Sequence, residues 1–240
     1  MYKPIAMQIF YAPDINGDIY TLAEKESKHC IRVLRMTSGA TVRLIDGKGN
    51  LYDAIITKPD AKKCTLAITR VIRDFETRNY RLHIAISPLK NYERFEWFIE
   101  KSVELGIDEI TPLICSNTEK PGIKKDRINN LVISAMKQSL KATRTILNET
   151  TLFVDFVNRE RDGQRMIAHC DSTKERSKIS GVYLKGENAV ILIGPEGDFS
   201  KEEILSATSA GYLSVHRGSS RLRAETAGVA ACHSIYYINQ

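Results

Sequence analysis

The stretch AVILIGPEGDFSKEEI, residues 189–204, joins an aliphatic strand to a loop that could hold a ligand. The strand leads into Gly194-Pro195-Glu196-Gly197, where two glycines let the backbone turn sharply and come within contact distance of a bound molecule. In open α/β sheets, small molecules bind at the carboxyl ends of the strands. The loop is therefore a candidate pocket wall, although glycine and proline also mark ordinary strand-to-helix connections.

A second stretch, residues 214–235, carries arginines after another short strand. Its sequence, SVHRGSSRLRAETAGVAACHSI, places a helix of mostly small residues behind a loop that contains Arg217, Arg221, Arg223 and Glu225. Guanidinium groups in such a loop are favourable where they meet an anion or a polar substrate. Small residues also let a helix pack closely on its neighbour or on a ligand. Together these features favour a binding site.

A basic stripe is predicted on a helix near residues 91–105. Its members recur every three or four positions and are Lys90, Arg94, Trp97, Lys101 and Glu104. Cations around an indole ring could bind nucleic acid or a partner subunit. A solvated helix face, with Lys101 and Glu104 as an i,i+3 ion pair, explains the same spacing. Spacing alone does not decide between these interpretations.

Several catalytic signatures are absent from the sequence. No GxGxxG follows a predicted strand, and GxxxxGK[ST], HExxH, GxSxG and Cys/His clusters with ligand spacing do not occur. The five histidines stand apart from one another. Dinucleotide, nucleoside-triphosphate and zinc chemistry therefore lack their signatures, and we expect no metal.

Two regions with different hydrophobic patterns must position these residues. In the first, the segments 41–46, 51–57 and 64–71 alternate apolar and polar side chains and are rich in β-branched residues, which predicts a strand meander. A short helix is predicted before them, over 24–36. We therefore expect a small β-rich domain over residues 1–73.

Alternating strands and helices are predicted over residues 74–240. The strand segments are 82–87, 108–114, 166–170, 189–194 and 213–215, and the helix segments are 91–105, 125–141, 200–210 and 225–238. Ser200 and Glu203 have the spacing of a capping box, and Gly106 stands where a helix C-cap favours glycine. This order predicts a mostly parallel α/β domain with helices on both faces of its sheet.

The basic excess of the chain lies in its first region. The protein has 240 residues, with 35 Lys and Arg against 29 Asp and Glu, a net charge of +6. Residues 1–73 hold 12 basic and 7 acidic residues, whereas the remaining 23 and 22 nearly cancel. A positive segment beside a near-neutral one predicts a module that binds a polyanion such as RNA, or only a solvated basic surface.

The composition excludes several classes of protein. Hydrophobic residues make up 42% and charged residues 27%, and no apolar run approaches the roughly 18 residues that span a bilayer, so we expect neither a disordered nor a membrane protein. The first residues lack the pattern of a secretory signal, which predicts a cytoplasmic protein. Five scattered cysteines fit buried, reduced thiols.

Five segments resemble a known family in their order and spacing. They are HCIRVLRM (29–36), KSVELGIDEITPL (101–113), MKQSLKATR (136–144), ILIGPEGDFSKEE (191–203) and RLRAETAG (221–228). Together they resemble the RsmE family of bacterial 16S ribosomal RNA uridine-N3 methyltransferases, over nearly the whole chain. The resemblance implies a PUA-like β-barrel over 1–73 that binds RNA and a SPOUT domain over 74–240. In that domain a trefoil knot would bind S-adenosylmethionine, and the protein would be a homodimer.

The resemblance also implies roles for individual residues. Arg223 would stabilise the charge that develops on uracil as N3 loses its proton, and Glu196 or Glu225 would accept that proton or order the loops. The residues expected to line the cofactor are His169, Cys170, Leu192, Gly194, Pro195, Glu196, Gly197, Leu213, Val215, Gly218, Leu222, Arg223 and Thr226. Those expected to contact 16S rRNA or the assembled small subunit are Lys28, Arg32, Arg35, Lys90, Arg94, Lys101, Gln138 and Lys141.

Two positions depart from the pattern that the family usually has. Asp198 stands where a second glycine is common, and Arg221 stands one residue beyond the usual place of an arginine. Two other functions fit the same regions. One is a knotted methyltransferase that acts on a ribose hydroxyl or on tRNA, and the other is a ribosome-assembly factor that performs no chemistry.

Overall fold

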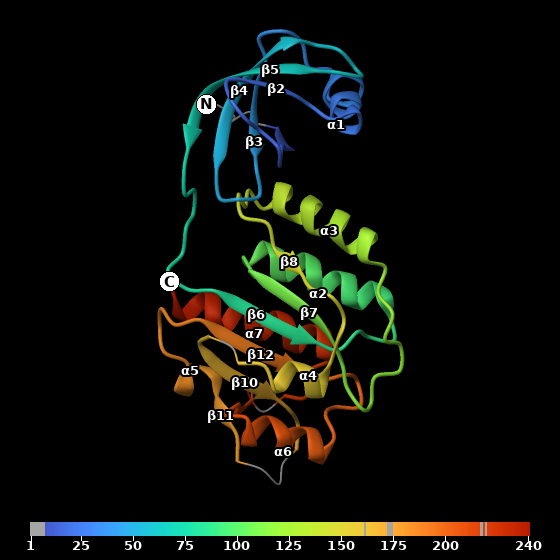
Figure 1. Ribbon diagram of the computed structural model, residues 1–240, viewed down its shortest axis with the longest axis vertical. Helices are drawn as coiled ribbons and strands as arrows, with labels where there is room; N and C mark the ends of the chain where they lie inside the picture. The colour runs from blue at the N-terminus through green and yellow to red at the C-terminus, as the bar shows by residue number, and fades with distance from the viewer. Residues whose placement is uncertain (1–7, 161, 172–174, 217, 219) are drawn as a thin grey trace. The chain divides into compact units, whose positions relative to one another are not determined.

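The computed structural model describes residues 8–160, 162–171, 175–216, 218 and 220–240. The chain divides into two compact units, which can be followed by colour in Figure 1. One unit comprises the residues up to 77 together with 136–144, and the other comprises 78–135 and 145–240. Each unit has a β-sheet of its own.

The first unit is built on a five-stranded sheet in the order β1-β3-β4-β5-β2. The strands are β1 (Ile9–Tyr11), β2 (Ile19–Thr21), β3 (Thr41–Ile45), β4 (Leu51–Lys58) and β5 (Thr65–Ile72). β3, β4 and β5 pair antiparallel, which confirms the predicted meander, and β1 pairs parallel with β3. Asp46 closes the first turn, because its carboxylate accepts the N–H groups of Lys48 and Asn50 at 2.7 and 3.1 Å.

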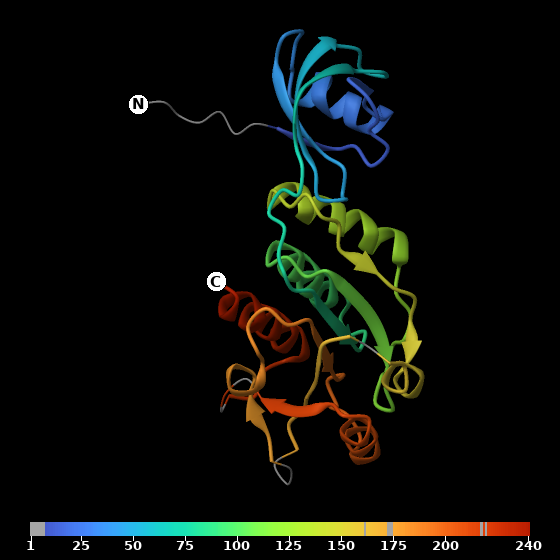
Figure 2. The same ribbon diagram turned by 60° about the vertical axis from the view of Figure 1, so that its left-hand side comes forward.

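One helical segment lies beside these strands (Figure 2). α1 (Glu24–Lys28) runs directly into a π-helical turn, η1 (His29–Val33), in which the N–H of Leu34 donates to the carbonyl of His29 at 3.0 Å. The helix predicted over 24–36 therefore ends early, since Arg35 has a left-handed φ of 53°. Cys30 of the turn packs into the core of the unit with residues of the sheet.

The segment 136–144 belongs to the first unit although it lies far along the chain. Its backbone pairs with the β3–β4 turn: the N–H of Gly49 donates to the carbonyl of Ala142 at 3.1 Å, and the N–H of Arg144 donates to the carbonyl of Gly47 at 2.9 Å. Lys137 forms an ion pair with Glu26 of α1 at 2.7 Å. The first unit is therefore assembled from two separate stretches of sequence.

The second unit contains a parallel sheet in the order β11-β13-β10-β12-β6-β7-β8, with β9 beside β7. Its strands are β6 (Leu82–Ile86), β7 (Glu109–Ile114), β8 (Ile146–Leu147), β9 (Thr151–Leu152), β10 (Gln164–Ala168), β11 (Ser177–Lys178), β12 (Ala189–Ile193) and β13 (Leu213–His216). All residues of β6 and β12 are buried, as expected for strands that are covered on both faces. The predicted parallel α/β domain is confirmed. The knot implied by the resemblance stays a prediction.

Helices cover both faces of this sheet (Figure 1). α2 (Tyr92–Glu104) and α7 (Ala224–Ile238) pack together over β6 and β12, and α5 (Ile179–Val182) contacts α7. α4 (Phe153–Val157) and α6 (Lys201–Ser209) pack together, with contacts to β7 and β10. α3 (Lys125–Gln138) begins in the second unit and ends in the first. In the part of the chain that the structure describes, none of these helices has the length and apolar content needed to cross a bilayer.

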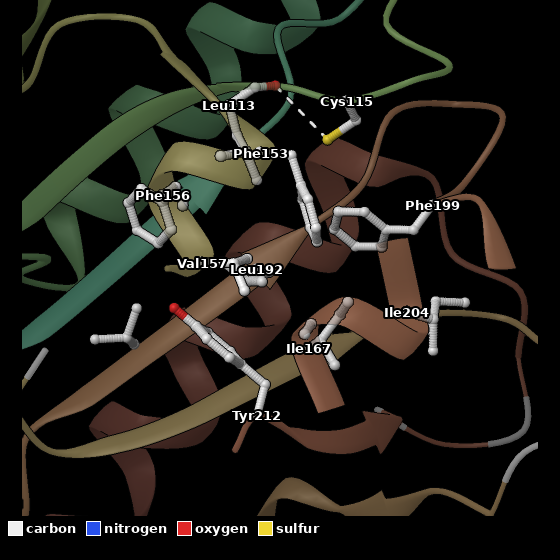
Figure 3. Close-up of a cluster of buried hydrophobic side chains, with 13 residues drawn as sticks. Leu113, Cys115, Phe153, Phe156, Val157, Ile167, Leu192, Phe199, Ile204 and Tyr212 are labelled. Atoms are coloured by element: carbon white, nitrogen blue, oxygen red, sulfur yellow. Dashed lines mark hydrogen bonds between the residues drawn. The ribbon is translucent and has the colours of Figure 1, made fainter. Parts of the chain in front are cut away.

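Adjacent residues of β6 point to opposite faces, as strand geometry requires. The side chain of Ile86 lies 3.3 Å from the place that a Cβ on Gly228 of α7 would take. Ala85 belongs to a buried cluster on the other side, shown in Figure 3. In that cluster the rings of Phe153 and Phe199 lie 5.6 Å apart between their centroids. Both faces of the sheet therefore carry a hydrophobic core.

The differences from the sequence prediction concern short elements and helix ends. β1, β2, β8, β9, β11, α4 and α5 were not predicted, because elements of two to five residues are too short to show a period. The helix predicted over 125–141 ends at Gln138, since Leu140 takes a left-handed φ of 59°. The capping box of Ser200 and Glu203 is confirmed, and Gly106 has the positive φ of a helix C-cap.

Candidate functional site

A cavity of about 290 Å³ opens at the carboxyl ends of β10 and β12. Ala168 at the end of β10 and Cys170 just after it line the cavity, and the end of β12 with the loop that follows contributes residues 193–196 and Asp198. Arg94 of α2 and residues 221–225 and 227, from the segment that enters α7 and from its first turn, complete the wall. The volume is near the lower end of the range for small-molecule pockets. The two stretches that sequence analysis singled out therefore share one pocket.

The loop after β12 is tightly turned. A Cβ on Gly194 would lie 3.1 Å from the backbone nitrogen of Phe199, so a side chain at this position would be crowded. The N–H of Asp198 donates to the carbonyl of Pro195 at 3.0 Å and closes the turn. Glu196 is exposed, and its carboxylate accepts the N–H of Lys90 at 3.0 Å. Glu196 therefore links this loop to the chain ahead of α2.

Asp198 connects two of the loops that line the cavity. Its backbone has a left-handed φ of 64°, which aspartate tolerates better than most residues. One carboxylate oxygen accepts the N–H of Cys170 at 2.7 Å, and the other accepts the N–H of Phe199 at 2.9 Å. The carbonyl of Asp198 accepts a hydrogen bond from the Asn117 side chain at 3.0 Å. A glycine here would keep the turn and lose the two bonds to the carboxylate.

Replacing Asp198 with glycine should release the loop after β10. The Cys170 amide would lose an ionised acceptor, and a hydrogen bond to a charged group contributes about 1.5–3 kcal/mol. We therefore expect the Cys170 amide to exchange its hydrogen roughly 10- to 100-fold faster, as measured by hydrogen exchange with NMR detection. Asp198→Asn keeps one acceptor oxygen and should give an intermediate rate. Unchanged protection of Cys170 in Asp198→Gly would contradict the role assigned to the carboxylate.

Charged groups from α2 and α7 meet at the same cavity. Arg94 Nε lies 3.8 Å from Glu225 Oε1. Glu225 is only 6% exposed, and its Oε2 has no hydrogen-bond partner among the described residues. Arg223 occupies the N-cap position of α7, is exposed, and forms no ion pair within the described ranges. The cavity is thus lined by the unpaired guanidinium of Arg223 and by the buried carboxylate of Glu225, whose Oε2 has no hydrogen-bond partner among the described residues.

Part of the predicted cofactor site lies in this cavity. Its predicted members that line the wall are Cys170, Gly194, Pro195, Glu196, Leu222 and Arg223, joined by Glu225 from the predicted catalytic set. Leu192 and Val215 are fully buried, and Leu192 packs in the cluster of Figure 3. Among the described residues, the wall does not include His169, Gly197, Leu213 or Thr226. A role for these six residues in binding stays a prediction.

A second, larger cavity of about 750 Å³ adjoins the first. It shares Cys170, Asp198 and Arg221 with the first cavity and includes Gly218, another predicted cofactor residue. Arg221, whose role the sequence left open, therefore borders both cavities. Arg217 lies outside the described residues.

The residues of the first unit that are predicted to contact RNA differ in whether they form ion pairs within the protein. Lys28 forms an ion pair with Glu24 at 2.6 Å, and Lys141 forms one with Glu76 at 3.0 Å. The remaining members are exposed and form no ion pair in the described part of the unit; they are Arg32, Arg35 and Gln138. Among the predicted RNA contacts of this unit, Arg32 and Arg35 are therefore the cations that form no ion pair in the described structure.

The stripe on α2 is engaged in ion pairs. Lys90 pairs with Glu119 at 2.9 Å, and Lys101 pairs with Glu100 at 2.8 Å and Glu104 at 2.7 Å. The i,i+3 pair that the spacing allowed is confirmed. Trp97 is 42% exposed. These neighbours reduce the net charge that this face offers to RNA.

The cysteines divide into buried and exposed groups. Cys30, Cys64, Cys115 and Cys232 are buried, as predicted, but Cys170 is exposed beside the cavity. Burial raises the pKa of Cys30 and Cys232 to about 12, which keeps these thiols protonated and unreactive at neutral pH. The prediction of buried thiols is therefore wrong for Cys170, because a loop at a pocket rim leaves its side chain uncovered.

The comparison with protein families identifies the two parts of the chain. Residues 76–236 match the family described as RNA methyltransferase domain, and residues 22–69 match the family described as RNA methyltransferase PUA domain. The chain belongs to the RsmE family of RNA methyltransferases. In this methyltransferase the β-rich unit contains the match to the PUA domain, and the parallel α/β unit contains most of the match to the methyltransferase domain. Both agree with the fold that the resemblance implied.

Relatives of this RNA methyltransferase cover almost its full length. A crystal structure from Porphyromonas gingivalis, named "probable rRNA-methyltransferase", is 40% identical with a TM-score of 0.91, covering 97% of this chain and 98% of its own. A Legionella pneumophila methyltransferase structure with bound SAM is 26% identical, with a TM-score of 0.86 and the same coverage. Ribosomal RNA small subunit methyltransferase E of Rickettsia conorii is 26% identical and covers 88% of this chain and 86% of its own.

Proposed function

We propose that this protein transfers a methyl group from S-adenosylmethionine to N3 of a uridine in 16S ribosomal RNA. The observation that carries the proposal is the cavity in which Arg223 and Glu225 face the backbone of the Gly194 loop. The bound cofactor in the Legionella relative and the name of the Rickettsia relative support it. Such a substrate also implies a cytoplasmic enzyme.

The residues that line the cavity fit S-adenosylmethionine. Ile193, Leu222 and Ala227 offer apolar surface for an adenine ring, and Gly194 and Pro195 line the cavity beside them. Carboxylates of Glu196 and Asp198 suit a ligand that carries ammonium and sulfonium charges. When bound, the cofactor supplies an activated methyl group on its sulfonium sulfur.

The residues of the chain would assist the acceptor base. N3 of uracil must lose its proton before or during transfer, and the carboxylate of Glu225, which lines the cavity, would accept it. The negative charge then spreads onto the neighbouring carbonyl oxygens, where a fixed guanidinium from Arg223 would stabilise it by about 3 kcal/mol. Glu196, which already holds the N–H of Lys90, would order the loop.

The decisive experiment is nucleoside mass spectrometry of 16S rRNA and of tRNA from cells that lack this protein. We expect 3-methyluridine to be lost from one position and to return when purified protein and S-adenosylmethionine are added. Loss of a 2′-O-methyl nucleoside or of a tRNA modification would instead support another knotted methyltransferase. Normal nucleosides, together with no calorimetric heat on adding S-adenosylmethionine, would support an assembly factor.

We also propose that the first unit, the PUA-like domain of the 1–73 region, binds RNA through Arg32 and Arg35. Replacing both with alanine should weaken RNA binding and flatten the slope of log affinity against log salt by roughly 0.7 to 0.9 per lost phosphate contact. Affinity for S-adenosylmethionine should be unchanged. The matched control is Arg159→Ala/Lys185→Ala, which removes two exposed charges from the second unit. An unchanged slope in Arg32→Ala/Arg35→Ala would leave the basic excess as a solvated surface.

A homodimer is the proposed assembly. The exposed Trp97 of α2 and the 71% exposed Tyr237 of α7 offer apolar surface that a second copy could cover, and a partner could complete the site at the cavity. Light scattering of the purified protein at micromolar concentration should give twice the chain mass of 27.1 kDa. A monomer under these conditions would contradict the proposed assembly.

A further inference from the structure

Arg94, a member of the predicted basic stripe, lies at the cavity. It lies in the first turn of α2, and its side chain lines the 290 Å³ cavity. Its guanidinium is 40% exposed and is directed at Glu225, with 3.8 Å between Nε and Oε1. Lys90 and Lys101 of the same stripe are not among the described residues that line the cavity. Arg94 therefore differs from these two lysines, because its side chain contacts the cavity.

Glu225 needs a cation at this place. It is 6% exposed, and a buried carboxylate without a compensating charge is strongly unfavourable. Arg94 is its ion-pair partner in the described structure. The pair uses Oε1, while Oε2 is buried and unpartnered beside the cavity. The arrangement thus compensates the charge of the Glu225 carboxylate through Oε1 and leaves Oε2 without a hydrogen-bond partner in the described structure.

The packing of the two helices fixes this pair. Asn91 caps α2, accepting the N–H of Glu93 at 2.9 Å and that of Arg94 at 3.4 Å. One turn further on, Phe98 is fully buried against Gly228 of α7. The backbones that carry Arg94 and Glu225 are therefore held on both sides, which sets the approach of the guanidinium to the carboxylate.

We propose that Arg94 is a positioning residue for methyl transfer, which acts through Glu225. The inference rests on the proposed function. Arg94 holds the Glu225 carboxylate in one orientation at the wall of the cavity, where the carboxylate accepts the proton from the N–H of the acceptor base. The proton passes from N3 to the Glu225 carboxylate, the N3 electron pair forms the bond to the methyl carbon, and the bond from that carbon to sulfur breaks. Arg94 itself touches neither the methyl group nor the base.

A double-mutant cycle tests the connection. The variants are Arg94→Ala, Glu225→Gln and the double variant, and the rate is methyl transfer from S-adenosylmethionine to small ribosomal subunits purified from cells that lack the protein. Each single change should lower kcat about 10- to 50-fold, and the double variant should be no slower than the slower single variant. KM for the subunit, RNA affinity and its salt slope should stay within about twofold. Arg94→Lys, which keeps the charge, should recover part of kcat.

The matched control is a second arginine–glutamate pair, which links α3 to α2. Arg127 of α3 pairs with Glu96 of α2, and neither is among the described residues that line the cavity. Arg127→Ala, Glu96→Gln and their combination should leave kcat unchanged. This control separates the effect of the cavity pair from the loss of an interhelical ion pair.

Two results would overturn the inference. Additive losses in the Arg94–Glu225 cycle would show that Arg94 does not act through Glu225. A rise in KM with a salt slope flatter by about 0.7 to 0.9, at unchanged kcat, would make Arg94 a phosphate contact. If the wild-type protein transfers no methyl group to the subunit, the proposed function fails and this inference fails with it, whereas active wild-type protein with an additive cycle removes only the inference.

Discussion

Arg223→Ala should lower kcat for methyl transfer to saturating substrate about a hundredfold or more. Arg223 lies at the N-cap of α7, lines the cavity, and forms no ion pair in the described part of the structure. Its guanidinium is therefore available to the oxygen that becomes negative as the base loses its proton. Removal of one such preorganised donor from an enzyme typically costs a factor of 10² to 10³ in kcat.

Steady-state kinetics with both substrates varied will separate the possible effects of this change. We expect KM for S-adenosylmethionine and RNA affinity to stay within a few-fold of wild type, because the interaction forms as the charge develops. Arg127→Ala is the control, since Arg127 is 58% exposed on another helix and does not line the cavity in the described structure. A higher KM with normal kcat would make Arg223 a ground-state binding group.

A side chain at position 228 should strongly destabilise the second unit. A Cβ on Gly228 would lie 2.5 Å from the ring of Phe98, which is fully buried and cannot move aside. Overpacking of this kind costs typically 1–3 kcal/mol, more than the roughly 1 kcal/mol that alanine contributes over glycine in a helix. Because the helix preference for alanine offsets about 1 kcal/mol of this cost, we expect Gly228→Ala to lower the unfolding free energy by up to about 2 kcal/mol, and Gly228→Val by more.

Two variants provide the controls for position 228. Gly181→Ala makes the same change in α5, where a Cβ has no neighbour within 4 Å, so stability should stay the same or rise. Gly228→Ala combined with Phe98→Leu removes the clashing ring atoms and should recover part of the loss. Urea unfolding followed by fluorescence of Trp97, the single tryptophan and a residue of α2, is the measurement. Equal stability of Gly228→Ala and wild type would mean that α2 and α7 can separate at no cost.

The sequence predicts the elements whose residues show a clear period. The aliphatic run of β12 and the capping box at Ser200 can be read locally, because strand burial and helix capping depend on residues within a few positions. The meander β3–β4–β5 follows from alternation in the same way. Strands of two residues such as β8 carry too few side chains for any pattern.

The site was predictable where it lies on those elements and not where distant segments meet. Gly194 and Arg223 could be chosen from their loops, whereas the pair of Arg94 and Glu225 depends on the packing of α2 against α7. The role of Asp198 was hidden for a related reason. Its carboxylate accepts a hydrogen bond from Cys170, 28 residues earlier, and no spacing rule connects those positions.

Because the first unit is divided between two stretches of chain, it cannot be completed during synthesis until the second stretch has been made. A nascent chain that ends at residue 77 lacks the segment 136–144 that pairs with the β3–β4 turn and carries Lys137 to Glu26. Translation at about 5–20 residues per second leaves roughly 3 to 13 seconds before that segment has been made. We therefore expect the N-terminal sheet to lack its contacts with residues 136–144 while part of the methyltransferase unit is already being synthesised.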